Sequence, residues 1–147
     1  MRRLIFSWLP PVIWMGVIFW FSHQSTLPTV AEPDVQYLIS KAAHLTEYAI
    51  LAVLLLRASY RSLGDRHSPS VAFYLAFGAA VVYAASDEFH QSFTPGRHPS
   101  IVDVVIDGGG AVAGLILTGV LVTRSRVGML LIGALVGERL QETERSE

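Results

Sequence analysis

The sequence predicts an all-α fold: a polytopic membrane protein built as a bundle of four transmembrane helices, with both termini in the cytoplasm (N-in/C-in). Three observations lead to this prediction. Charged residues make up only 16% of the chain and hydrophobic residues 52%, whereas soluble domains carry about 25% charged residues. Four apolar runs approach the ~20 residues that a bilayer span requires. The basic residues also gather in alternate connections between these runs.

The first run, residues 4–21, is uncharged and rich in aromatic and branched side chains. Pro10 and Pro11 lie near its start, and we expect them to bend or delay the helix. Two arginines before an apolar core also suit a signal peptide. No small-residue cleavage site follows Phe21, so we expect a signal anchor that stays in place.

The other three runs each carry ionisable or amide side chains at one end. They are residues 38–56, with Lys41, His44 and Glu47; 70–86, followed by Asp87, Glu88 and Gln91; and 101–122, with Asp103 and Asp107. A last apolar run, 128–137, is too short to span and suits an interfacial helix or a segment packed against the bundle. We therefore expect a transmembrane domain over 1–127, followed at 128–147 by a short apolar segment and a polar cytoplasmic tail.

The basic residues predict the orientation, because Lys and Arg in short loops favour the cytoplasmic side. Nine of the eleven fall on one side of the predicted spans, before the first, between the second and third, and after the fourth. Only Lys41 and Arg97 belong to the other side. We therefore expect a multi-pass protein of the cell membrane with residues 22–37 and 91–100 outside.

Neither a basic arm nor aromatics interleaved with Lys and Arg are present, so we expect no nucleic-acid partner.

On this topology the intramembrane polar residues of three helices converge on the outer face. A charged residue at mid-membrane costs about 2.5 to 3.5 kcal/mol on insertion scales, so such residues are candidate functional sites. Ion pairing is the structural alternative, but five carboxylates (Glu47, Asp87, Glu88, Asp103, Asp107) face two fixed cations. The excess must be protonated, share protons, contact water or bind a cation.

Small residues continue the acidic stripes of the third and fourth spans. Asp103 and Asp107 are four apart and lead into Gly110 and Gly114, a small-xxx-small pattern that allows close helix packing. Ala80 and Ala84 lead up to Asp87 in the same way. We expect both glycines to face another helix at close range.

The segment Thr94-Pro95-Gly96-Arg97 has the signature of a type II turn, with Pro and Gly at the central positions. Such a turn projects Arg97 back over the cluster. Arginine suits bidentate contact with a phosphate or carboxylate. Its partner is then either a ligand or one of the carboxylates Asp87 and Asp103.

Three stretches of this sequence closely resemble the VanZ-like family of bacterial membrane proteins. They are Phe19-Trp20-Phe21-Ser22-His23-Gln24-Ser25, Lys41-Ala42-Ala43-His44-Leu45-Thr46-Glu47-Tyr48, and Ser86 to Arg97 continuing through Ser100 and Asp103 to Gly114. Where the family pattern carries Asn, four residues after its motif Asp, this chain has Asp107. The family is named for a glycopeptide-resistance protein. The resemblance implies a bacterial cell-envelope protein, for which an antibiotic-resistance role is one reading.

Two functional hypotheses remain open from the residues. The first is a nonenzymatic protein that binds an amphiphilic ligand beside membrane lipid, either a lipid-linked cell-wall precursor or a glycopeptide-type antibiotic. Its ligand-binding candidates are Lys41, His44, Glu47, Asp87, Glu88, Gln91, Arg97, Ser100, Asp103 and Asp107.

The second hypothesis is a membrane-embedded hydrolase or transferase. Here His44 is the general base or a metal ligand, with Glu47, Asp87 or Asp103 as partners and a divalent cation as a conceivable cofactor. His-x-x-Glu places both side chains on one helix face, as chelation requires. Transport is disfavoured, because the inner halves of the third and fourth spans carry no charge.

Overall fold

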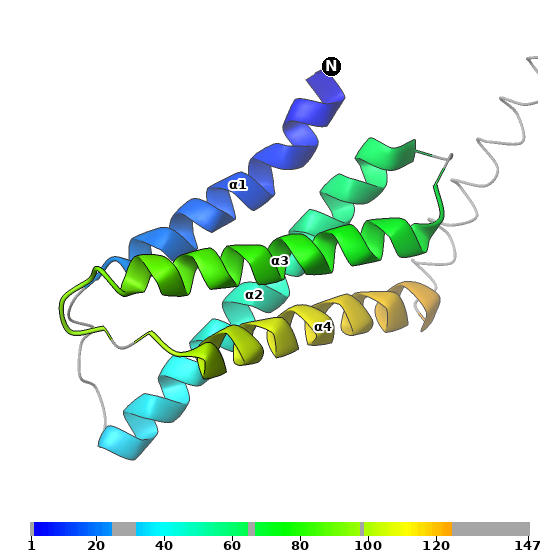
Figure 1. Cartoon of the computed structure of the whole chain (residues 1–147). Coiled ribbons are helices and arrows are strands. Elements are labelled where there is room, and N and C mark those ends of the chain that lie inside the picture. The colour runs from blue at the N-terminus through cyan, green and yellow to red at the C-terminus, as the bar shows by residue number, and fades with distance from the viewer. Residues whose placement is uncertain (1, 25–31, 65–66, 98, 125–147) are drawn as a thin grey trace, which may run out of the picture. The chain divides into compact units, whose positions relative to one another are not determined.

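The computed structural model describes residues 2–24, 32–64, 67–97 and 99–124. Within these ranges the chain forms four α-helices and no strand: α1 (Arg2–Ser22), α2 (Pro33–Leu63), α3 (Pro69–Gln91) and α4 (Ile101–Arg124) (Figure 1). All four are long and apolar enough to cross a membrane by length and composition. The predicted number and class of elements are thereby confirmed.

The chain divides into two compact units, Met1–Leu115 and Ile116–Glu147. The first unit holds α1, α2, α3 and the part of α4 that carries the polar residues. In the second unit the structure describes only the last turns of α4, up to Arg124. The apolar run at 128–137 lies outside the described residues.

The ends of α2 and α3 follow from local sequence signals. Helix α2 begins at Pro33, whose fixed φ suits the first helical turn, and ends before Gly64, which has a φ of 60°. The helix is longer than the apolar run predicted at residues 38–56, because hydropathy identifies only apolar residues and both ends of the helix are polar. Helix α3 is capped by Ser68, whose Oγ accepts a hydrogen bond of 3.3 Å from the Ser70 amide.

Helix α1 contains Pro10 and Pro11 in its interior and already begins at Arg2. The expectation that the prolines delay the helix is therefore wrong. A proline removes one backbone hydrogen bond, but membrane helices tolerate it because neighbouring groups satisfy the freed carbonyl.

Hydrogen bonds and packing join α1 to the other helices. The Trp14 indole donates to the Glu47 carbonyl of α2 at 2.9 Å, and the Tyr83 hydroxyl of α3 donates to the Met15 carbonyl at 2.6 Å. Ile18 lies fully buried in the shared core. The first helix is thus an integral part of the bundle.

The core is built around a ladder of alanines on α3. Ala72, Ala76, Ala80 and Ala84 recur every four residues and are all buried. Large apolar side chains instead point outward on every helix, and Ile101 leaves 85% of its surface exposed. Larger side chains such as Tyr48 and Leu51 fill the rest of the core. Small residues at helix contacts and many large apolar residues on the outer surface are the arrangement expected of helices packed in lipid.

Helices α2 and α4 approach each other at the two predicted glycines. A Cβ atom built on Gly110 would lie 2.2 Å from the Leu45 carbonyl oxygen, and one on Gly114 would lie 2.5 Å from that of Ala49. Only glycine permits these contacts. The expected close packing is confirmed, and α2 is the partner helix.

Candidate functional site

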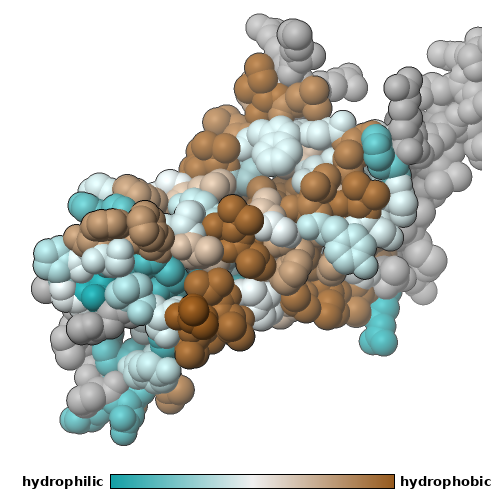
Figure 2. All heavy atoms as spheres, in the orientation of Figure 1, coloured by the Kyte–Doolittle hydropathy of each residue, from teal (hydrophilic) through white to brown (hydrophobic). Residues whose placement is uncertain are grey.

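The polar residues of the bundle gather at the end where α1 finishes, α2 begins and α3 connects to α4. Figure 2 shows hydrophilic residues at this end and apolar residues over the middle of the helices. The buried polar side chains of this end come from α1, α3, α4 and the connecting loop; they are Ser22, Asp87, Glu88, Gln91, Thr94, Asp103 and Asp107. The structure thus brings together residues that the sequence scatters over three spans.

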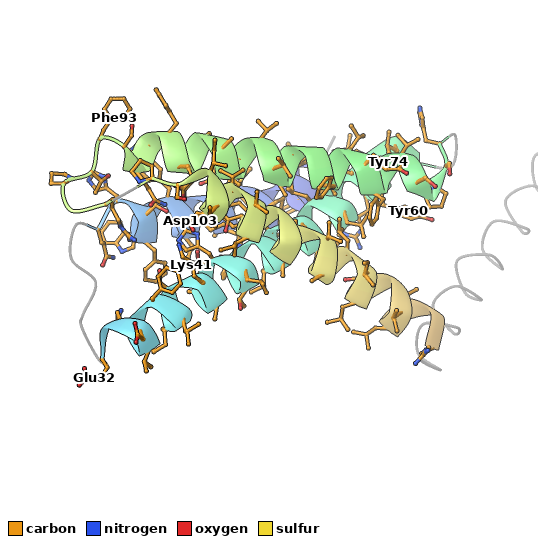
Figure 3. The ribbon with its side chains drawn as sticks, turned by 60° about the horizontal axis from the view of Figure 1, so that its bottom comes forward. Glu32, Lys41, Tyr60, Tyr74, Phe93 and Asp103 are labelled. Atoms are coloured by element: carbon orange, nitrogen blue, oxygen red, sulfur yellow. The ribbon has the colours of Figure 1, made fainter. Side chains whose placement is uncertain are left out.

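Lys41 and Asp103 form an ion pair between the first halves of α2 and α4. Their side chains point toward each other in Figure 3. The pair is partly shielded, with 21% and 10% of the two side chains exposed. Asp103 is therefore already engaged by a cation of the chain itself.

His44 pairs with Asp107 one turn deeper. Its Nδ1 lies 3.2 Å from Asp107 Oδ1, and the Asp107 side chain is completely buried. Sequence reasoning named Glu47, Asp87 and Asp103 as partners of His44. The hydrogen-bond partner in the structure is Asp107, which the same reasoning had placed among the ligand-binding candidates.

Asp87 lies at the centre of a second buried group. Its Oδ2 accepts hydrogen bonds from the Ser22 hydroxyl at 2.7 Å and from the Gln91 amide at 3.0 Å. The i to i+4 spacing of Asp87 and Gln91 predicted their proximity. Ser22 was missed as a site residue, although it lies within the first family motif.

Glu88 is fixed by the start of α4. Its Oε2 accepts a hydrogen bond of 2.8 Å from the Ser100 amide, while the Ser100 hydroxyl accepts from the Val102 amide at 3.1 Å. Ser100 thus serves as the N-cap of α4 and as an anchor for Glu88. Both residues were candidates, but nothing in the sequence indicated that they bond each other.

Arg97 follows the predicted turn. Gly96 has a φ of 81°, and the Arg97 amide bonds the Thr94 carbonyl at 3.2 Å, as a type II turn requires. The guanidinium donates to the backbone carbonyls of Gln24 at 3.1 Å and Phe21 at 2.8 Å. Arg97 therefore fastens the loop to the end of α1, and its hydrogen bonds in the structure go to neither Asp87 nor Asp103.

A cavity of about 290 Å³ opens beside these groups. Its wall combines apolar side chains with charged ones: Phe21, Ser22, Gln36, Ile39, Ser40, Ala43, His44, Glu47 and Arg97. The glutamate, the histidine and the arginine give the cavity both signs of charge. This mixed lining is what an amphiphilic ligand at a membrane surface requires.

His23 and His90 form a separate pair that sequence reasoning did not identify. Their ring nitrogens lie 3.3 Å apart, and Phe19 packs against His90 with ring centroids 4.4 Å apart. His23 lies in the first family motif and His90 in the third. Their proximity follows from the contact between α1 and α3, which no spacing within one helix reveals.

Comparison with known proteins identifies the family of this chain. No curated protein and no solved structure matched the chain. The family model described as VanZ/LLP1 matches residues 6–122, which cover α2 and α3, nearly all of α1 and α4, and every group described in this subsection. A match over this much of the sequence shows that the chain belongs to the VanZ/LLP1 family.

Proposed function

We propose that this protein resides in the bacterial cell envelope and binds an amphiphilic ligand at the polar end of its helices. The observation that carries the proposal is the cavity of about 290 Å³, which joins Phe21 and Ile39 to Glu47 and Arg97. Such a cavity accommodates a polar headgroup and the first carbons of a chain. A lipid-linked cell-wall precursor is the ligand class that we favour, because the cavity lies among helices whose outward faces suit lipid.

Arg97 is the residue best suited to a headgroup oxygen. Two of its hydrogen bonds go to backbone carbonyls, and a guanidinium has five N–H donors. The donors that remain suit a phosphate or carboxylate. The carbonyl contacts hold the group in place before the ligand arrives.

The test uses two neighbouring alanines as a matched pair. Both alanines are exposed, but Ala43 lines the cavity and Ala42 does not. Protein purified in mild detergent is examined by native mass spectrometry for retained lipid. We expect Ala43→Phe to reduce retention at least tenfold, because the ring fills the cavity, and Ala42→Phe to leave it unchanged.

Equal retention by both variants would overturn the proposal. A glycopeptide-type antibiotic is the other amphiphile to be distinguished. Expression of the wild type in a susceptible host identifies it as the ligand if resistance rises and Ala43→Phe abolishes the rise.

A membrane-embedded hydrolase or transferase is the second candidate, favoured by the contact between His44, which lines the cavity, and the buried Asp107 behind it. A histidine held by a buried carboxylate is the arrangement of a general base. Products cleaved from a panel of phospholipid and glycolipid substrates would be sought by mass spectrometry. Turnover that His44→Gln abolishes while ligand retention persists would favour catalysis over binding alone.

A further inference from the structure

Three side chains from three helices converge below the ion pair of Lys41 and Asp103. His44 of α2, Glu88 of α3 and Asp107 of α4 each offer one ligand atom, and these atoms lie within 4.8 Å of one another. In a tetrahedral zinc site, two ligand atoms lie roughly 3.4 Å apart, because each is about 2.1 Å from the metal. Adjustments of about an ångström therefore suffice to close these three donors around one ion.

Two of the converging carboxyls each have a buried oxygen without a partner among the described residues. These oxygens are Asp107 Oδ2 and Glu88 Oε1, and their residues are 0% and 6% exposed. Burying an uncompensated carboxylate oxygen is unfavourable unless a donor or a cation offsets it. The unpartnered atoms therefore indicate an occupant, independently of the clustering itself.

The fixed cations nearby do not supply that compensation. Lys41 bonds Asp103, and Arg97 bonds two backbone carbonyls. A doubly charged ion would balance the Glu88 and Asp107 carboxylates.

Each carboxyl is also positioned by a bond through its other oxygen. The Ser100 amide holds Glu88 Oε2 at 2.8 Å, and His44 lies 3.2 Å from Asp107 Oδ1. The Ser100 amide is an outer contact of the kind that orients metal ligands in known sites, whereas the contact of His44 with Asp107 joins two of the converging residues to each other. Both contacts leave Glu88 Oε1 and Asp107 Oδ2 available as donors.

We propose that His44, Glu88 and Asp107 bind a divalent transition-metal ion, with zinc as the representative. The imidazole nitrogen disfavours calcium and magnesium, which prefer all-oxygen shells. The chain has no cysteine, so the donors are borderline to hard and suit zinc, manganese or iron(II).

The site lies within reach of water and of the cavity. Asp107 is six residues into α4, about 9 Å along its axis at 1.5 Å per residue, and His44 lines the cavity as well as the cluster. Three protein ligands leave at least one coordination position open, as in zinc sites that bind a further ligand. The ion would thus bring positive charge to a cavity wall that also carries Glu47.

Metal binding is measured on the full chain, stripped of metal with a chelator and titrated with zinc alone against a chromophoric competitor. We expect one zinc ion per chain in the wild type. His44→Gln, Glu88→Gln and Asp107→Asn should each weaken binding at least tenfold. The Glu88→Gln side chain still accepts the Ser100 amide bond, so this variant is expected to fold.

Two controls separate this site from other histidines and acids. His90→Gln removes a histidine from the pair with His23, and Asp34→Asn removes an exposed acid from the first turn of α2. Both should bind zinc as the wild type does. Zinc should also raise the Tm of the wild type and both controls, but not that of Glu88→Gln.

The proposal is overturned if the wild type binds none of zinc, manganese and iron(II), or if binding is lost in His90→Gln and retained in His44→Gln. The measurement involves no lipid. A negative result in the lipid experiment would therefore not weaken a positive zinc result. A negative zinc result would likewise not weaken a positive lipid result.

Discussion

Three of the four buried carboxyls in the described part of the chain share one feature. Asp87, Glu88 and Asp107 each have one oxygen hydrogen-bonded and a second oxygen with no partner among the described residues. The first bond fixes the direction of the side chain, and the second oxygen is left available to a further hydrogen-bond donor or a cation. The ion pair with Lys41 explains Asp103, and the contact with His44 accounts for one oxygen of Asp107, but neither accounts for the second oxygens of these three residues.

Ser22→Ala should destabilise the fold, because it removes the hydroxyl that donates to buried Asp87. Loss of a hydrogen bond to such a group costs about 1 to 3 kcal/mol. Thermal unfolding in detergent measures the change. Ser86→Ala is the control, since the exposed Ser86 hydroxyl bonds only its own helix at the Tyr83 carbonyl; an equal loss in both variants would argue against the buried bond.

Lys41→Met and Asp103→Asn should be coupled in a double-mutant cycle. Either change alone leaves a partly shielded charge without its partner, so the double variant should lose less than the sum. Coupling of about 0.5 to 3 kcal/mol is expected for groups in contact. Combining Lys41→Met with Asp34→Asn, an exposed acid in the first turn of α2, should give additive losses; coupling there as strong as with Asp103 would contradict the assigned pair.

At the scale of elements, α2 and α4 both run away from the polar end and meet at successive levels. Lys41 bonds Asp103 and His44 bonds Asp107 at the polar end. Deeper in the bundle, the backbone of α2 at Leu45 and Ala49 lies against two glycines of α4. The close backbone contact below sets the positions of the polar pairs above.

Gly110→Ala should destabilise the protein, because its new Cβ would lie 2.2 Å from a backbone oxygen that cannot move alone. Overpacking of this kind costs about 1 to 3 kcal/mol. Gly109→Ala is the matched control, since a Cβ there meets nothing within 4 Å. Its Tm should be unchanged or raised. Similar Tm values for both variants would refute the contact between the helices.

The sequence predicted the helices better than the side-chain contacts between them. Runs of apolar residues identified all four helices, and small-residue spacing identified the faces of Gly110 and Gly114. The His44–Asp107 bond and the Ser100 anchor of Glu88 were not predicted. Each depends on the rotation of one helix against another, which spacing within a single helix does not determine. The delay expected from the prolines of α1 was wrong for a related reason, since their effect depends on neighbouring helices.

For the whole molecule, the distribution of basic residues predicts that the polar end faces outward. Helix α2 carries Arg57 and Arg61 at its far end, and α4 ends at Arg124. This orientation would expose the cavity to ligands that approach from outside the cell. The proposals for ligand binding share this expectation.

Single cysteines test the orientation without background, because the chain has none. Phe93→Cys lies at an exposed position in the loop after α3, and His67→Cys at an exposed position between α2 and α3. A membrane-impermeant maleimide should label Phe93→Cys in intact cells and His67→Cys only after lysis. The opposite pattern would place the polar end in the cytoplasm.

The glycine contacts between α2 and α4 have a consequence for the thermodynamics of binding. Helices held at backbone distance cannot slide or rotate without steric overlap, so the backbones that carry His44 and Asp107 are in place before a ligand arrives. Preorganised sites lose little conformational entropy on binding. We therefore expect ligand or metal binding to leave the helical framework unchanged, and affinity to depend on the atoms displayed at the polar end more than on any closing motion.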